Sequence, residues 1–447
     1  MADSPDGIYE KGVVDPGFPV KNSTQPFWLT EPCKISKLQS PWPEKTVDIA
    51  VVGSGMTAAS LVNSLYSKQP NLEITILEAR DLCSGATGRN GGHIKAMSPG
   101  SWFERKEKFG IQEAVRIMEY EHSHLKEMAA CIRDNNIHCD LDEVEGLDVY
   151  YDEKVFRRAC DAVDDMRQQA PALGAIYNIY TAREELKERN ISPACFGAIG
   201  MPAASMWPYK MVTSLLEKMV QQQGLSIQTN TLVTAVYDDD NKDFAVVRTD
   251  RGDIRAKHVV HATNAWVSRL IPELRQFVSP VRANVQRQVP QMHESEKSKR
   301  RFRNSWWSRY GEHDYEYMVQ RPDGAYVLGR ASTGRRATAD DSTMDFLAHA
   351  HLQGVTPRVF EFGAKDVKVT HSWSGSVAFT IDGNPFVGRL PFAGRQHQWI
   401  CAAYSGIGMV RAFKSGQLLA LMLLGEEKTS YCIMFAVEDD PSNKNNY

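Results

Sequence analysis

The segment from Val47 to Gly92 constrains the fold of this chain more than any other stretch. The apolar run Val47–Val52 predicts a strand, and the glycine turn Gly53-Ser54-Gly55 follows it. A helix is then expected over about Thr57–Gln69, and a second strand over Glu73–Leu77. This order predicts a βαβ unit, in which a helix joins two parallel strands.

The residues of the turn fit a dinucleotide. Gly53 allows a tight turn, and Gly55 has no side chain to block a pyrophosphate from the helix N-terminus. Ala58 stands at the third position of G-x-G-x-x-G, and Glu78 follows at the distance at which a carboxylate meets a ribose. An ordinary glycine turn is the alternative interpretation, but strand, helix, second strand and acid all agree with a dinucleotide site.

The loop Ala79–Gly92 indicates which dinucleotide is bound. It is rich in glycine and small polar residues, with Arg89 and Asn90 just before Gly91-Gly92. Such a loop brings many backbone donors to a polyanion. A nicotinamide does not need it, whereas FAD must be held along its ribityl chain as well, so the loop favours FAD over NAD. A flexible surface loop is the alternative.

Length and charge narrow the class of protein. A chain of 447 residues suggests two domains, and a net charge of −3 does not favour a nucleic-acid partner. The longest apolar stretch, Leu418–Leu424, is far shorter than the ~20 residues that cross a bilayer, and Met1–Glu10 lacks the pattern of a signal peptide. We expect a cytoplasmic protein without a membrane partner; the oligomeric state stays open.

The cysteines do not suggest a metal centre. Eight cysteines are scattered without C-x-x-C spacing, and no H-E-x-x-H pattern occurs. Buried thiols are therefore expected, and no metal site.

Apolar periodicity predicts further elements in the first half of the chain. One or two amphipathic helices are expected from Trp102 to about Asn136, and strands over Val144–Tyr151 and Ala194–Ser205 with helix across Asp152–Asn190 between them. A helix is expected from Pro208 through Gln223, ended by Gly224.

The second half predicts strands. Runs at Ser226–Tyr237, Phe244–Thr249 and Ile254–Ala262 read as strands, and the last ends in small polar residues, as at the carboxyl edge of a parallel sheet. Alternating runs within Ile271–Val369 indicate a largely antiparallel sheet. After it, the turn Tyr404–Met409 opens a helix through Leu424, which offers a second helix N-terminus to the cofactor.

These motifs resemble a known family. VVGSGMTAAS, LEARDLCSGATGRNGGHIK, HVVHATNAW, RPDGAYVLG and W-x-G…DGNPFVG…SGIGM are similar to the FAD-dependent D-amino-acid oxidase superfamily. The closer resemblance is to its glycine/sarcosine oxidase and γ-glutamylputrescine oxidase-like branch, including fungal members. It implies an α/β fold: a discontinuous, Rossmann-like FAD-binding domain (GR2-type) with an α+β substrate domain on a mostly antiparallel sheet.

The resemblance also implies a domain layout. We expect an N-terminal arm at 1–45, an FAD-binding domain from 46–139, 205–269 and 371–425, a substrate domain from 140–204 and 270–370, and a tail at 426–447.

The resemblance implies the residues of the cofactor site. The pyrophosphate would lie on the first glycines, the ribose on Glu78, the adenine on the backbone of Val233, and the isoalloxazine edge near Gly406, Gly408 and Met409. The full expected set is Gly53, Ser54, Gly55, Met56, Thr57, Ala58, Glu78, Ala79, Arg80, Ser84, Gly85, Ala86, Thr87, Arg89, Asn90, Gly91, Gly92, Val233, Thr263, Asn264, Gly406, Ile407, Gly408 and Met409.

The chemistry implied by the resemblance is oxidation of a C–N bond in a small-molecule substrate. The amine carbon gives a hydride to flavin N5, the imine hydrolyses, and O₂ takes up the electrons to form H₂O₂. His93 and Lys95 are candidates for amine deprotonation or oxygen activation, although His93 is equally consistent with a hydrogen-bonded core histidine. Trp373 and Tyr404 are expected to line the pocket near the ring.

Three positions depart from the family pattern. Ile407 replaces a histidine of many relatives, and Val410 stands where sarcosine oxidase-like members carry a lysine for the substrate carboxylate; Arg411 would point elsewhere. No cysteine lies between Trp373 and Asp382, so FAD is expected to be non-covalent. These differences argue against an ordinary small amino acid as substrate.

Aromatic residues of the middle segment allow two interpretations. They line a roomy pocket, or they form sheet core or dimer contacts, and the second interpretation is favoured. They are Trp306, Trp307, Tyr310, Tyr315 and Tyr317.

The leading functional interpretation is an FAD-dependent amine or amino-acid oxidase. The alternatives are a flavoenzyme of secondary metabolism that performs a dehydrogenation or rearrangement without fast reoxidation by O₂, a scaffold without turnover, and, least favoured, an NAD-binding dehydrogenase.

Overall fold

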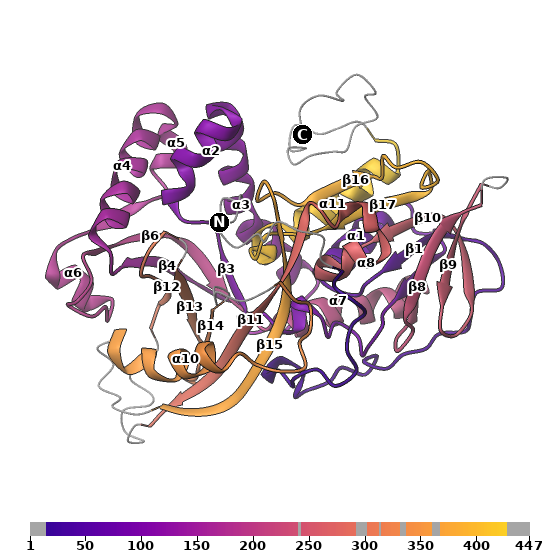
Figure 1. Cartoon of the computed structure of the whole chain (residues 1–447), viewed down its shortest axis with the longest axis horizontal. Helices are drawn as coiled ribbons and strands as arrows, with labels where there is room; N and C mark the ends of the chain where they lie inside the picture. The colour runs from indigo at the N-terminus through magenta and orange to yellow at the C-terminus, as the bar shows by residue number, and fades with distance from the viewer. Residues whose placement is uncertain are drawn as a thin grey trace.

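The structure is a computed structural model that describes residues 15–239, 243–291, 302–312, 314–330, 337–359 and 367–426. Residues 1–14 of the expected arm and 427–447 of the expected tail lie outside this part of the chain. Two sheets form the frame of the molecule. In Figure 1 they lie side by side, and the long strands β11 and β15 of the second sheet run between them.

The first sheet has eight strands and a parallel centre. Five strands run parallel in the order β17-β10-β1-β2-β7, while β16 and the β8–β9 pair are antiparallel additions. Its strands are β1 (Val47–Val52), β2 (Ile74–Leu77), β7 (Ser226–Gln228), β8 (Val233–Asp238), β9 (Ala245–Thr249), β10 (Asp253–His261), β16 (Phe386–Arg389) and β17 (Gln398–Ala402).

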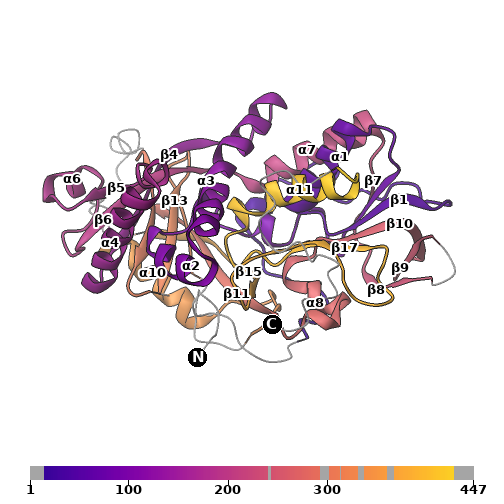
Figure 2. The same ribbon diagram turned by 90° about the horizontal axis from the view of Figure 1, so that it is seen from above.

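Both faces of the first sheet are covered. Figure 2 shows α1 (Met56–Lys68), α7 (Pro208–Gln223) and α11 (Ala412–Leu423) on one face and β8–β9 on the other. Alternate residues of β1 point to opposite faces: Ile49 and Val51 pack with the helices, and Ala50 and Val52 pack with β8–β9. The apolar run of β1 is therefore explained by burial on both sides.

The second sheet has nine strands in the order β15-β11-β14-β13-β12-β4-β6-β3, with β5 beside β6. Its described pairings are antiparallel except that between β4 and β12. Its strands are β3 (His93–Lys95), β4 (Asp142–Tyr150), β5 (Asn178–Tyr180), β6 (Gly197–Ser205), β11 (Val278–Pro290), β12 (Asn304–Arg309), β13 (Tyr315–Gln320), β14 (Tyr326–Arg330) and β15 (Val367–Thr380).

The remaining helices lie mostly around the second sheet (Figure 1). They are α2 (Trp102–Phe109), α3 (Ile111–Asp134), α4 (Glu153–Gln169), α5 (Pro171–Gly174), α6 (Arg183–Glu188), α8 (Val267–Leu270) and α10 (Phe346–Val359). No helix within the described ranges is long and apolar enough to cross a bilayer.

The predicted fold class is confirmed: a parallel-rich sheet stands beside a mostly antiparallel one. Three local predictions were wrong. Asp152–Asn190 is not continuous helix, because β5 pairs with β6 inside it. Ser226–Tyr237 splits into β7 and β8 at Asn230, which adopts a left-handed φ of 49°. Strand β12 was not expected at all, because the tryptophans at its centre break the alternation of apolar and polar residues.

The pairings also bear on the domain layout, which stays a prediction. Residues 93–95 and 371–380 were expected in the FAD-binding domain. Strands β3 and β15, which contain them, both pair within the second sheet. Segments that were expected in the FAD-binding domain therefore supply two strands of the second sheet.

Candidate functional site

One long cavity runs from the carboxyl end of β1 to the second sheet. The space between its walls, including the part open to solvent, amounts to about 1910 Å³. The turn after β1, the loop after β2, the start of β8, the end of β10 and the loop after β17 line one part of it. Residues of β3, β11, β12, β13 and β15 line the other.

The turn after β1 forms a cradle that only glycine permits. Gly53 has a φ of +106°, and a Cβ at this position would lie 2.6 Å from the carbonyl oxygen of Ala262. A Cβ on Gly55 would lie 3.0 Å from Thr87 Oγ1. Ser54, Met56 and Thr57 also line the cavity, whereas Ala58 is buried in the core beneath α1. Ala58 thus supports the turn by packing, without reaching the cavity.

Glu78 lies at the end of β2 and lines the same part of the cavity, beside Val233. Its Oε2 accepts hydrogen bonds from Ser54 Oγ (2.6 Å) and Ser54 N (3.3 Å), and its Oε1 accepts one from Arg80 N at 3.0 Å. The carboxylate is therefore held in one orientation at the rim of the glycine turn.

The loop after Glu78 wraps the cavity as a wall. Ala79, Arg80, Gly85, Ala86, Thr87, Arg89, Asn90 and Gly91 line it. Ser84 and Gly92 do not. The carbonyl of Ser84 accepts hydrogen bonds from Arg80 and Arg89, and Gly92, with a φ of +73°, leaves no room for a side chain beside Trp28. These two residues shape the loop from behind.

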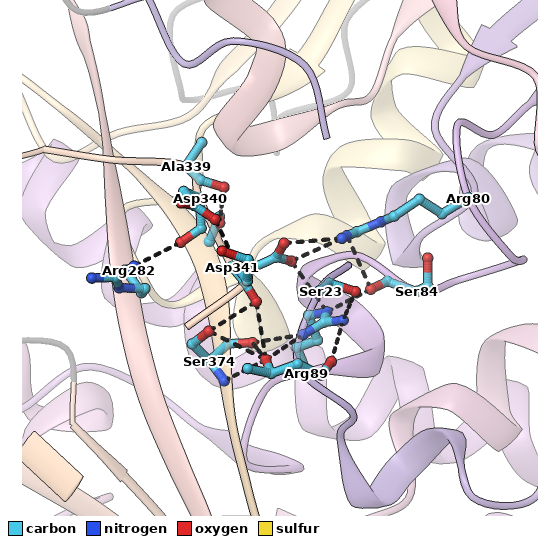
Figure 3. A network of polar contacts seen from close by, with 12 residues as sticks. Ser23, Arg80, Ser84, Arg89, Arg282, Ala339, Asp340, Asp341 and Ser374 are labelled. Atoms are coloured by element: carbon cyan, nitrogen blue, oxygen red, sulfur yellow. Dashed lines mark hydrogen bonds and ion pairs between the residues drawn. The ribbon is translucent and has the colours of Figure 1, made fainter. Parts of the chain in front are cut away.

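Arg89 holds the loop in place, as Figure 3 shows. Its guanidinium is 2% exposed, and its five N–H groups are all engaged. Nε donates to Ser84 O (2.8 Å), Nη1 to Ser374 O (2.8 Å) and Thr24 Oγ1 (3.1 Å), and Nη2 to Ser23 Oγ (2.7 Å) and Thr24 O (2.8 Å). The Arg89 side chain therefore has no donor left for a phosphate, which favours a supporting role for it; because Arg89 lines the cavity, its contact with the cofactor stays a prediction.

Asp341 is the counter-ion of this network. It is 0% exposed, accepts two hydrogen bonds of 3.0 Å from Arg80 Nη1, and lies 3.3 Å from Arg89 Nε. Its backbone carbonyl accepts from Thr24 N at 2.9 Å. Asp341 thus joins the segment before α10 to the cofactor loop through its carboxylate and to the N-terminal arm through its backbone carbonyl (Figure 3).

The loop after β17 faces the glycine turn across the cavity. Ala403, Ser405 and Gly406 adopt left-handed φ values, and Asn264 Oδ1 accepts from the backbone nitrogens of Ala403 (3.2 Å) and Tyr404 (3.4 Å). Tyr404, Gly406, Ile407, Gly408 and Met409 line the cavity, as do Thr263 and Asn264. This loop therefore contributes to the same cavity as the glycine turn, and its expected place at the isoalloxazine edge stays a prediction.

His93 and Lys95 lie two residues apart on β3, so both side chains face the cavity while Ile94 enters the core. Lys95 Nζ lies 2.6 Å from Asp148 Oδ1 and 4.1 Å from the ring centre of Trp307. Burial lowers the pKa of Lys95 to about 8, against the opposing effect of Asp148. Lys95 is therefore a paired but readily titrated cation.

His93 is held as a neutral ring. Trp307 Nε1 donates to His93 Nδ1 at 3.1 Å, so the proton is on Nε2, which lies 2.7 Å from Ser305 Oγ. Burial, reinforced by the charge of Lys95, lowers the pKa of His93 to about 3. Both nitrogens are engaged, which favours the alternative of a hydrogen-bonded core histidine; a role of His93 in amine deprotonation or oxygen activation stays a prediction.

The structure separates the two other predicted pocket residues. Trp373 does not line the cavity; it is fully buried, and its Nε1 donates to Arg89 O at 2.7 Å. Tyr404 lines the cavity, but its hydroxyl lies 2.6 Å from Thr57 Oγ1 and donates to Cys401 O at 3.0 Å. The sequence motifs predicted that both residues lie near the site. They did not predict where the indole nitrogen of Trp373 and the hydroxyl of Tyr404 point.

Three of the middle aromatic residues fit both interpretations, because they pack with the core and also line the cavity. Trp307, Tyr315 and Tyr317 line the cavity, and Trp307 stacks on Tyr315 with ring centres 5.1 Å apart. Trp306 lies in the core on the other face of β12. Because residues alternate along a strand, recognising β12 would have separated Trp306 from Trp307.

Comparisons with known proteins agree with this geometry. The family model described as FAD dependent oxidoreductase (DAO) matches residues 48–422. The chain is 24% identical over 391 residues to the probable oxidoreductase OrdL of Rhizobium meliloti (strain 1021), covering 86% of this chain and 84% of the relative. It is 22% identical over 388 residues to gamma-glutamylputrescine oxidoreductase of Escherichia coli (strain K12), covering 85% and 84%. It superposes on glycine oxidase from Geobacillus kaustophilus with a TM-score of 0.66 at 18% identity, covering 86% and 96%.

Because the family model spans most of the chain, this protein belongs to the FAD-dependent oxidoreductase family. The residues fit that cofactor. The cradle at Gly53 would be filled by any Cβ, Thr263 Oγ1 is buried at the cavity without a hydrogen-bond partner, and Glu78 stands oriented at the turn. These features suit a pyrophosphate and a ribose.

Proposed function

We propose that this protein oxidises a C–N bond of an amine or amino-acid-derived metabolite, with non-covalent FAD as cofactor and O₂ as electron acceptor. The observation that carries the proposal is the continuity of the cavity, which joins the glycine cradle to a chamber walled by Trp307, Tyr315 and Tyr317. When bound, FAD accepts a hydride from the amine carbon and passes two electrons to O₂, giving an imine and H₂O₂.

The comparisons support this reaction class. One relative is named for γ-glutamylputrescine and one structural neighbour for glycine, both of which carry an amine. No cysteine lines the cavity among the described residues, which supports non-covalent binding.

In this proposal the first glycines hold the pyrophosphate, Glu78 the adenosine ribose, and Val233 the adenine. Ala86, Thr87 and their neighbours follow the ribityl chain, and Gly406–Met409 border the flavin edge. All of these residues line the first cavity, which supports the assignment.

Lys95 supplies the positive charge and Trp307 the wall beside the flavin. A cation near the place where O₂ is reduced stabilises the negative charge that develops there. His93, held neutral, orients Trp307 through the hydrogen bond to its indole. In this arrangement no side chain of β3 removes the amine proton, so the substrate binds with its amine already neutral.

One observation favours a second candidate function. Asp148 partly compensates the charge of Lys95, and Ile407 and Val410 add apolar surface to the same cavity, so Lys95 presents less than its full charge to the chamber. A flavoenzyme of secondary metabolism that dehydrogenates or rearranges its substrate without fast reoxidation by O₂ does not need a stronger positive charge beside the flavin.

An anaerobic experiment separates the two candidates. Holoenzyme is mixed with a panel of primary and secondary amines, and bleaching of the flavin absorbance is followed before air is admitted. Bleaching with rapid recovery and H₂O₂ release supports the oxidase; bleaching with slow recovery supports the second candidate. Retention of the oxidised spectrum with every amine would refute the proposed C–N chemistry.

A further inference from the structure

A second cavity of about 930 Å³ adjoins the first, and Tyr315 and Ile407 line both. Strand β12, the end of β4, the start of α2 and the turn around Asp382 contribute to it. Its buried charged groups are all cations: Arg105, Arg309 and Arg411. Its remaining charged groups, Glu104, Arg158, Glu312 and Asp382, are half-buried or exposed.

Arg309 carries a donor that the protein leaves unused. The residue is 4% exposed, and its Nε donates to Asp148 Oδ2 at 3.1 Å. Its Nη2 is buried without a hydrogen-bond partner. The guanidinium lies 5.2 Å from the ring centre of Trp307 and 5.1 Å from that of Tyr315, the two aromatic residues that separate it from the first cavity. A buried charged donor without an acceptor is costly, so an acceptor is expected there.

The buried charges around the second cavity do not balance, although its exposed and half-buried groups include three carboxylates. Lys95 and Arg309 share the single carboxylate of Asp148, and Arg105 and Arg411 share that of Glu121. Burial alone would raise the pKa of Asp148, but the neighbouring cations outweigh it and hold this pKa at about 2, so the carboxylate is already ionised. Each buried cluster therefore keeps one positive charge in excess.

We propose that the second cavity binds a carboxylate of the substrate on Nη2 of Arg309, while the amine lies in the first cavity. This inference rests on the proposed function and narrows its substrate class to amines that bear a carboxylate set apart from the C–N bond that is oxidised. Such a molecule passes between Tyr315 and Ile407, the residues common to both cavities. A monoanion matches the single unused donor and the single excess charge of the Arg309 cluster.

The test measures binding, which does not depend on turnover. Hexanoate and its neutral isostere hexanamide are titrated into the holoenzyme by calorimetry and by perturbation of the flavin spectrum. A charge-assisted hydrogen bond from a buried guanidinium predicts that hexanoate binds about tenfold tighter than hexanamide or more.

Three variants locate the effect. Arg309→Met should reduce the preference for hexanoate over hexanamide to less than about threefold, because the remaining Lys95–Asp148 pair has no excess positive charge. Arg309→Lys keeps a cation for Asp148 and guards against a folding defect; it should weaken hexanoate as well, because one ammonium has no second nitrogen to offer. Arg158→Met removes an exposed cation of the same cavity, paired with Glu312, and should change hexanoate affinity less than twofold.

The outcomes decide the inference. Equal binding of hexanoate and hexanamide to the parent protein, or a preference that survives in both Arg309 variants, would overturn it. An equal loss in Arg158→Met would also overturn it, because general electrostatic attraction would then suffice. Failure of the proposed function is recognised separately, as a flavin that no amine bleaches while the hexanoate preference follows Arg309.

Discussion

Replacing Asp341 by asparagine tests whether one carboxylate holds the cofactor loop in place. The side chain is fully buried and neutralises two guanidiniums, those of Arg80 and Arg89, at 3.0 and 3.3 Å. Asp341→Asn keeps the shape of the side chain and one oxygen acceptor but removes the charge. Both arginines lie on the loop that lines the cavity, so their loss of a counter-ion is expected to loosen that wall.

The magnitude follows from the burial of the pair. Removing one partner of a buried ion pair costs about 3–5 kcal/mol, and we expect the lower end because the amide still accepts a hydrogen bond. If about 3 kcal/mol falls on the ordered loop, the dissociation constant for FAD rises about 100-fold. Loosening of the same network should also lower the melting temperature of the holoenzyme.

The assay is titration of the apoprotein with FAD, followed by flavin fluorescence, together with thermal unfolding. Asp340→Asn is the matched control. Asp340 is the adjacent residue, is exposed, and accepts from Ser342 N through its side chain. A change in FAD affinity below about threefold in Asp341→Asn, or an equal change in both variants, would refute the reasoning.

Four further predictions rest on the same geometry. Gly53→Ala places a Cβ 2.6 Å from Ala262 O at a φ of +106° and should abolish FAD retention. Gly354→Ala, on the exposed face of α10 and outside the cavity lining, places a Cβ with nothing within 4 Å and should retain FAD; the FAD content of the purified proteins distinguishes the two variants. Reoxidation of the flavin by O₂ should slow as the pH rises through about 8, because the lowered pKa of Lys95 makes its side chain neutral above that value. In Lys95→Met, stopped-flow traces should show reoxidation that is about tenfold slower or more and independent of pH in this range. The unfolded state binds more protons than the folded state between the two pKa values of Lys95, so stability to denaturant should rise from pH 8 to 10 in the parent more than in Lys95→Met. Tyr404→Phe should lower stability by about 1 kcal/mol, seen in denaturant titrations, and leave kcat within about threefold, because its hydroxyl contacts Thr57 and Cys401; a large loss of kcat at unchanged stability would restore a catalytic role.

Much of the candidate site was predictable because its residues are close in sequence. The glycine turn, Glu78 and the loop 79–92 belong to one local unit, and most of these residues line the cavity. What local pattern could not reveal is the partner of each polar atom. Arg89 reads as a phosphate ligand until its donors are traced to Ser23, Thr24 and Ser374, which lie far from it along the chain.

The substrate side was less predictable for the same reason. Asp148 and Arg309 are ordinary strand residues by sequence, and they meet Lys95 because β4 and β12 pair in register while β3 lies across β6. The second cavity combines residues from α2, β12 and the loop before β16, which no spacing connects. The only sequence signal was the alternation along β12, which the tryptophan pair obscured.

The sequence by itself determined the class of fold and the cofactor cradle of this protein. Both depend on short-range physics: a glycine that must adopt a positive φ, an apolar strand buried on both faces, and an acid one strand later. Only the tertiary structure decided which charges are compensated and which are left over. That balance depends on distances and burial between segments far apart in the chain, and it is the excess of cations around Asp148 and Glu121 that points to the substrate.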